Sequence, residues 1–92
     1  GLTKPWTGRR KRLTHAKMVV ALEIDALGLR CPLPVLRARK ALSQIDPGGV
    51  LRLWADDPMA MIDIPHFCRE AGHEFIAMEE RDGAQLYLIR RG

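Results

Sequence analysis

The spacing of hydrophobic and polar positions predicts four strands. Residues 19–25 (VVALEID) alternate loosely and begin with β-branched side chains, whereas residues 50–55 (VLRLWA) are mostly apolar, as expected for a central strand. Residues 73–81 and 84–91 predict two further strands. The Asp82-Gly83 pair between them is typical of a two-residue hairpin turn, so these two strands are expected to pair with each other.

Two other segments repeat with the helical period. From residue 32 to about residue 45, one face is apolar and contains Val35, Ala38, Ala41, Leu42 and Ile45. Pro65 lies within the second repeat, and a proline costs ~3 kcal/mol inside a helix but little in its first turn. We therefore predict a helix over residues 64–71, with Asp63 as its N-cap and Gly72 at its end.

The order of these elements, β-α-β-α-β-β, predicts the fold. Two amphipathic helices and four strands pack naturally in two layers. The right-handed crossover rule places both helices on the same face of the sheet. We therefore expect an α/β protein, specifically an α+β two-layer sandwich with a four-stranded mixed sheet.

Charge divides the chain into two parts. The 92 residues include 15 Lys or Arg and 11 Asp or Glu, but residues 1–17 contain six of the basic residues and no acidic one. We expect residues 1–17 to be a disordered basic tail and residues 18–92 to be the folded domain. Met18 is a candidate native start, in which case part of the tail is a remnant of expression. The alternative for the tail is a basic arm that contacts RNA or another acidic partner. Direct nucleic-acid binding by the slightly acidic folded domain is not expected.

The number of cysteines and the length of the apolar runs indicate in which cellular compartment the protein works. The longest purely apolar run, residues 18–22, is much shorter than the ~20 residues of a membrane-spanning helix, and no secretory signal pattern is present. The chain has two cysteines, Cys31 and Cys68, whereas small secreted domains usually carry several that are paired as disulfides. We expect a cytoplasmic protein with free thiols and no membrane association.

The chemistry is expected at Cys31. Pro32 suits the first position of a helix, which makes Cys31 the N-cap, a position where cysteine is a poor substitute for Ser, Thr, Asp or Asn. The helix dipole and the neighbouring Arg30 favour a thiolate, so a lowered pKa is expected for Cys31. Pro32 and Pro34 stiffen the turn. This segment is therefore expected to present a nucleophilic sulfur.

The remaining residues narrow that chemistry. A cysteine enzyme usually has a partnered base, but His15, His66 and His73 form no recognisable arrangement with Cys31. No Cys-x-x-Cys motif supplies a resolving thiol. A cysteine that accepts and hands on a sulfur atom needs only exposure, a low pKa and a docking surface. Cys31 is therefore the predicted catalytic residue, and no cofactor is expected.

Three other residues whose side chains could act as a nucleophile or a metal ligand are expected to have structural roles. Cys68 lies on the apolar face of the second helix and is predicted to be buried in the core. Asp56 and Asp57 suit turn and capping roles better than half of a metal site, because no His, Cys or carboxylate cluster accompanies them. No metal is expected.

The motif around Cys31 also resembles a known family. Residues 27–34 (LGLRCPLP) contain the Cys-Pro-x-Pro signature of the TusA (SirA-like) sulfurtransferases. The similarity continues through residues 55–58 (ADDP), 63–68 (DIPHFC) and 87–90 (YLIR), and it covers about residues 22–91 with all motifs in order. The resemblance implies a β-α-β-α-β-β sandwich that relays sulfur as a persulfide. A cysteine desulfurase charges the motif cysteine, and a downstream protein accepts the sulfur.

The resemblance implies three possible destinations for that sulfur: 2-thiouridine in tRNA, molybdenum cofactor assembly, or sulfur oxidation. Members that serve tRNA thiolation carry an acidic residue at the position of Leu33, so the apolar residue here is expected to change partner choice but not the sulfur chemistry. Candidate docking residues are Leu33, Leu36, Arg37 and Lys40. A carrier that docks both partners through one thiol is expected to be a monomer. The alternative function is a regulatory or binding module of the same fold without sulfur transfer.

Overall fold

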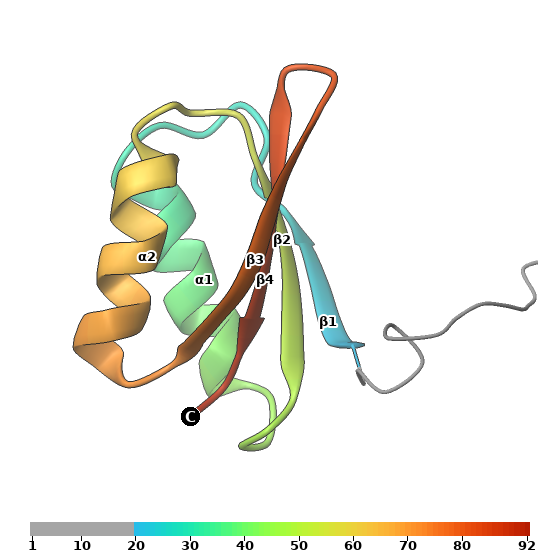
Figure 1. The fold of residues 1–92 in the computed structure, drawn as a ribbon, viewed down its shortest axis with the longest axis vertical. Helices are drawn as coiled ribbons and strands as arrows, with labels where there is room; N and C mark the ends of the chain where they lie inside the picture. Colours follow the sequence, from blue (N-terminus) through green and yellow to red (C-terminus); the bar gives the residue numbers. More distant parts are fainter. Residues whose placement is uncertain (1–19) are drawn as a thin grey trace, which may run out of the picture.

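Four strands and two helices follow one another in the order that the sequence predicts (Figure 1). The computed structural model describes residues 20–92, so the basic segment 1–17 lies outside the described residues. The strands are β1 (Val20–Asp25), β2 (Val50–Ala55), β3 (Glu74–Arg81) and β4 (Ala84–Arg90). The helices are α1 (Leu33–Ser43) and α2 (Ala60–Ala71).

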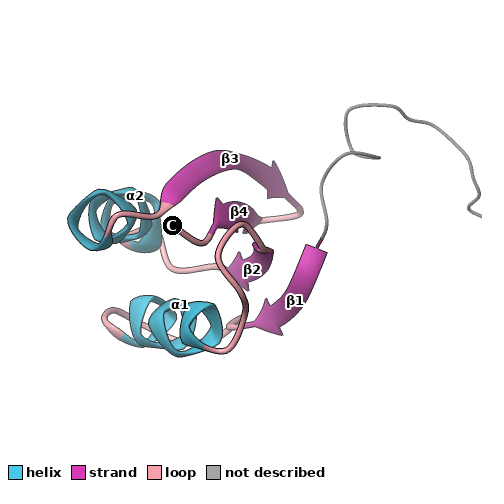
Figure 2. Cartoon of the chain, turned by 90° about the horizontal axis from the view of Figure 1, so that it is seen from below, coloured by secondary structure: helices cyan, strands magenta, loops and turns pink. Residues whose placement is uncertain are grey.

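The strands form one mixed sheet in the order β1-β2-β4-β3. β1 and β2 are parallel, and β4 is antiparallel to both of its neighbours. Figure 2 shows both helices on the same side of this sheet. The expected two-layer α+β sandwich is therefore confirmed. The central strands β2 and β4 are the most buried, which explains why their sequences are apolar almost throughout.

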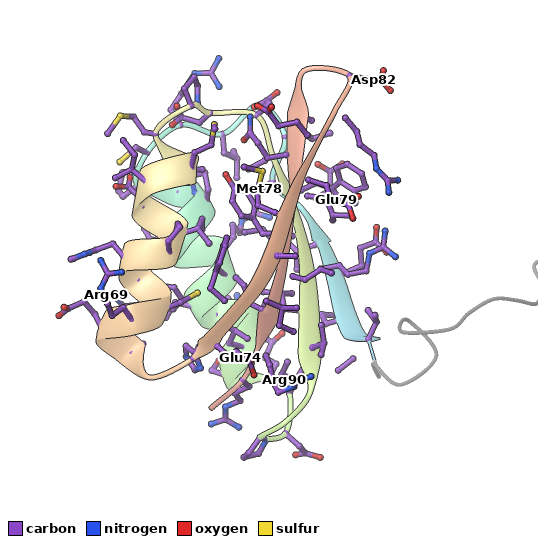
Figure 3. All side chains as sticks on the ribbon, in the orientation of Figure 1. Arg69, Glu74, Met78, Glu79, Asp82 and Arg90 are labelled. Atoms are coloured by element: carbon purple, nitrogen blue, oxygen red, sulfur yellow. The ribbon has the colours of Figure 1, made fainter. Side chains whose placement is uncertain are left out.

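The core fills the space between the helices and the sheet. Most of the residues that the helical spacing predicts to face the core are buried, namely Ala38, Ala41, Leu42, Ile64, Phe67 and Cys68. Two positions of the same predicted faces differ, because Val35 is half-buried and Ala71 is exposed. The buried helix side chains pack against the central strands, chiefly against Leu51, Leu53, Tyr87 and Ile89. Met78 of β3 joins them from the edge of the sheet (Figure 3). The amphipathic pattern thus fixes which face of each helix meets the sheet.

Helix α1 begins at Leu33 rather than at Pro32. Pro32 is the N-cap, so the assignment of Cys31 to that position is wrong: Cys31 is the residue before it. The carbonyl of Arg30 accepts the N–H of Leu33 at 2.8 Å, which forms a tight turn just before the helix. Neither proline has an N–H that would need a partner, so the first turn tolerates the lack of a side-chain cap.

Helix α2 begins at Ala60, four residues before the predicted start, and contains Pro65 in its interior. The assignment of Asp63 as N-cap is therefore wrong. The N-cap is Met59, which has no side-chain capping hydrogen bond. Asp57 stabilises the turn just before the helix, because its Oδ1 accepts the N–H of Met59 at 3.1 Å and its carbonyl accepts that of Ala60 at 2.9 Å. Pro65 removes only one backbone hydrogen bond. Packing of the apolar face compensates for that loss.

Left-handed backbone closes α2 and the hairpin between β3 and β4. Gly72 ends α2 with φ 81°, and its N–H donates to the carbonyl of Cys68. Asp82 and Gly83 have φ values of 51° and 80°, as a type I′ turn requires. Both sequence predictions, the helix end at Gly72 and the two-residue hairpin, are confirmed.

Candidate functional site

The parallel pairing of β1 and β2 creates the site. Both strands end at the same edge of the sheet, so the loop before α1 and the loop before α2 lie next to each other (Figure 1). The first loop contains Arg30 and Cys31, and the second contains Asp56 and Asp57. This edge is where α/β sheets commonly place functional groups, because side chains from separate loops converge there.

Asp57 ties the two loops together. Its Oδ2 accepts the backbone N–H of Cys31 at 2.7 Å, while its Oδ1 accepts that of Met59 at 3.1 Å. The residue is only 5% exposed. The hydrogen bonds from Cys31 and Met59 hold the pKa of Asp57 below its usual 3.8. Of the turn and capping roles expected for this residue, the turn role is observed, and the same carboxylate also fixes the backbone that carries the thiol.

Asp56 holds the other end of the first loop. Its Oδ1 accepts the N–H of Gly28 at 3.0 Å and lies 3.5 Å from Nη1 of Arg30. The Arg30 guanidinium is therefore paired with a carboxylate of the neighbouring loop. From the sequence, Arg30 is expected to stabilise a thiolate at Cys31. In the structure, its ion pair with Asp56 joins the two loops instead.

Cys31 presents an exposed, free thiol at this edge. Its Sγ donates a hydrogen bond to Oδ2 of Asp63, in the first turn of α2, at 3.0 Å. The hydrogen bond to Asp63, some desolvation, and the negative charges of Asp63 and Asp57 all raise the pKa of Cys31 above its usual 9.0. The lowered pKa expected from the helix dipole and Arg30 is therefore wrong. The surroundings of the sulfur therefore favour the protonated thiol over the thiolate.

Exposed apolar side chains accompany the thiol on the first turns of both helices. On α1, Leu33 is 46% and Leu36 49% exposed, and the docking candidates Arg37 and Lys40 are also exposed. Beside α2, Met59 is 47% exposed, and Ile62 within the helix is 65% exposed. Sequence reasoning missed Met59 and Ile62. The signal that could have identified them is their position off the buried face of a helix that starts at Ala60.

Among residues 20–92, the other candidate residues make no hydrogen bond to the thiol. Cys68 is 1% exposed in the core, as its position on the apolar face predicts, and burial raises its pKa to about 11. His66 is exposed on α2 and His73 packs against the ring of Phe67. Within residues 20–92, no group of three or more His, Cys, Asp and Glu side chains is arranged to hold a metal ion. None of the helices in this range is long and apolar enough to cross a membrane.

The fold and the site together define a small α+β domain that presents one free thiol between two aspartate-linked loops. Residues 22–91 match the profile of the family described as Sulfurtransferase TusA, and the chain belongs to that family. Its members are sulfurtransferases, which carry sulfur from a donor to an acceptor. A crystal structure of a SirA-like protein from Desulfitobacterium hafniense has a similar fold, with a TM-score of 0.69 and 32% sequence identity; the match covers 77% of this chain and 97% of that one.

Proposed function

We propose that this protein accepts a sulfur atom on Cys31 as a persulfide from a cysteine desulfurase and passes it to a downstream protein. The observation that carries the proposal is the placement of Cys31. It is the exposed cysteine of the pair within a chain that belongs to a sulfurtransferase family. Its loop is held to the rest of the domain by Asp56 and Asp57, so the sulfur is presented from a fixed backbone.

The transfer requires no cofactor on this chain. The Cys31 thiol gives up its proton, its sulfur attacks the terminal sulfur of the donor's persulfide, and a new bond forms between these two sulfur atoms. The donor's own sulfur–sulfur bond breaks, and its electron pair remains on the donor cysteine, which takes up a proton. A thiol and a persulfide thus exchange places with no net oxidation, and the same exchange in reverse delivers the sulfur to an acceptor thiol.

The surroundings of the thiol favour docking of protein partners. Leu33 and Leu36 form an exposed apolar surface on α1, and Arg37 and Lys40 add positive charge to the same helix. We infer that donor and acceptor contact these side chains, and that the apolar Leu33 favours an acceptor with an apolar residue opposite it. The acceptor would belong to tRNA thiolation, molybdenum cofactor assembly or sulfur oxidation. A persulfide carrier with a free thiol suits the reducing cytoplasm, and a monomer leaves this surface accessible.

The test is intact-mass measurement after incubation with a cysteine desulfurase, free cysteine and pyridoxal phosphate. We expect one reductant-removable sulfur atom on the wild-type protein and none on the folded Cys31→Ser variant. Cys68→Ala is the matched control, because it removes the buried thiol and should still be loaded. Absence of loading on a folded wild-type protein by a desulfurase from the same cell would favour the alternative, a binding module of the same fold.

A further inference from the structure

Asp63 is an acidic residue that the sequence assigns to helix capping and that the structure places against the reactive sulfur. Its Oδ2 lies 3.0 Å from Sγ of Cys31, although the two residues are 32 positions apart in the chain. Because the helix already begins at Ala60, the carboxylate is not needed as its cap. Its position at the thiol therefore calls for a separate explanation.

The three carboxylates around the thiol differ in how many hydrogen bonds and ion pairs they accept. Asp57 accepts two backbone N–H groups, and Asp56 accepts one N–H and pairs with Arg30. Among residues 20–92, Asp63 accepts a hydrogen bond only from the thiol, and the ion pairs of this range use other acidic residues. A thiol is a weak hydrogen-bond donor, so Asp63 is the carboxylate of this site that remains open to a stronger donor.

We propose that Asp63 holds Cys31 as a protonated, unreactive thiol in the free carrier, and that a basic side chain of the docked partner releases it by binding the same carboxylate. This inference rests on the proposed function, since the partner is the sulfur donor. A hydrogen bond from Lys or Arg to a carboxylate is charge-assisted and roughly twice as strong as a neutral one. A partner's cation therefore displaces the thiol from Asp63 and places a positive charge beside the sulfur.

The exchange leaves all atoms and electrons accounted for. In the free carrier the proton stays on Sγ, because a thiolate beside Asp63 and Asp57 is opposed by two negative charges. When the partner's cation pairs with Asp63, the thiol loses its proton to solvent and the thiolate attacks the donor's terminal sulfur. The departing donor thiolate takes a proton from solvent, so the step needs no additional oxidant or reductant.

The first measurement is the rate of Cys31 alkylation by iodoacetamide as a function of pH. We expect Asp63→Asn to shift the profile to lower pH and to raise the rate at pH 7 severalfold, even though a less basic thiolate is slightly less nucleophilic. Glu74→Gln is the control, and its profile should match the wild type. Glu74 pairs with Arg90 at 2.6 Å (Figure 3), and Arg90 lies opposite Val50 at the start of β2, whereas the Cys31 loop lies where β1 and β2 end. An unchanged midpoint in Asp63→Asn would overturn the proposal.

The second measurement is sulfur loading by the desulfurase at pH 7. If the partner releases the thiol, wild type and Asp63→Asn are loaded at rates that differ much less than their alkylation rates. Loading that accelerates by the same factor as alkylation shows that the partner does not neutralise Asp63, and it overturns the release step. Loading of neither protein, with the alkylation profiles shifted as expected, refutes the proposed function while leaving the thiol-holding role of Asp63 established.

Discussion

Replacing Cys68 tests whether the two cysteines have opposite roles, one chemical and one structural. Cys68 is 1% exposed and belongs to the core between α2 and the sheet. A serine at this position brings a hydroxyl of similar size into the same space. An alanine removes the sulfur atom and leaves a small void. Neither change touches the loop that carries Cys31.

The expected cost follows from burial. Placing a hydroxyl in an apolar site costs about 1–3 kcal/mol, and we expect the lower part of this range because a helix carbonyl one turn earlier offers the hydroxyl an acceptor. Alanine loses about 0.8 kcal/mol of transfer free energy plus a cavity contribution. In a domain of this size each kcal/mol lowers Tm by about 4–8 °C. Both variants should therefore melt several degrees below the wild type.

The alkaline pH dependence provides an independent signature. Burial raises the pKa of Cys68 from 9.0 to about 11, so the folded state keeps the proton that the unfolded state loses. The resulting stabilisation is complete below pH 9 and disappears as the pH rises toward 11. Cys68→Ala lacks this contribution, so its free energy of unfolding should decline less steeply over that range. Tyr87, whose pKa burial raises to about 12, affects both proteins equally.

Urea unfolding followed by circular dichroism measures these differences, and reaction with a thiol reagent reports access to each cysteine. In the native wild type we expect the exposed Cys31 thiol to react first, and the buried Cys68 thiol only when the domain opens. Sulfur loading on Cys31 should be unchanged in both variants at temperatures where they are folded. A Cys68→Ser protein as stable as the wild type, or a native Cys68 as reactive as Cys31, would refute this reasoning.

Two further outcomes are expected. Arg37→Glu on α1 should slow sulfur loading by the desulfurase. Arg69→Glu makes the same charge change in the last turn of α2 (Figure 3) and should leave the loading rate unchanged. Equal loading rates for the two variants would show that Arg37 is not part of the docking surface. Gly72→Ala should lower the free energy of unfolding by about 1 kcal/mol, because Gly72 has φ 81° and a Cβ is strained there even though nothing lies within 4 Å of it. Chemical denaturation measures this loss, and an unchanged midpoint would contradict the strain argument.

The fold was predictable because its determinants are local. The helical spacing of Ala38, Ala41 and Leu42 and the turn chemistry of Asp82-Gly83 each act within a few residues, and the structure confirms both. The start of α2 was not predictable from Pro65 alone. Asp57 holds the turn before the helix, and the gain from burying Ala60 in the core outweighs the hydrogen bond that the proline removes.

The position of the nucleophile could be predicted from the sequence, but its electrostatics could not. The motif around Cys31 predicts an exposed thiol, and the thiol is exposed. The expected lowered pKa relied on neighbours in the sequence, whereas the groups that set it come from the following loop and helix. Asp56 takes up the charge of Arg30, and Asp63 reaches the sulfur only because the parallel strands bring the two loops together.

The single exposed thiol at one edge of the sheet limits how the donor and the acceptor can bind. If Cys31 carries sulfur as proposed, the donor and the acceptor compete for the same small area, and a complex of all three proteins is sterically unfavourable. The carrier then alternates between its partners in a double-displacement cycle, and the flow of sulfur depends on how fast each partner departs. Tight binding to either one would slow delivery, so moderate affinity for both is the better arrangement.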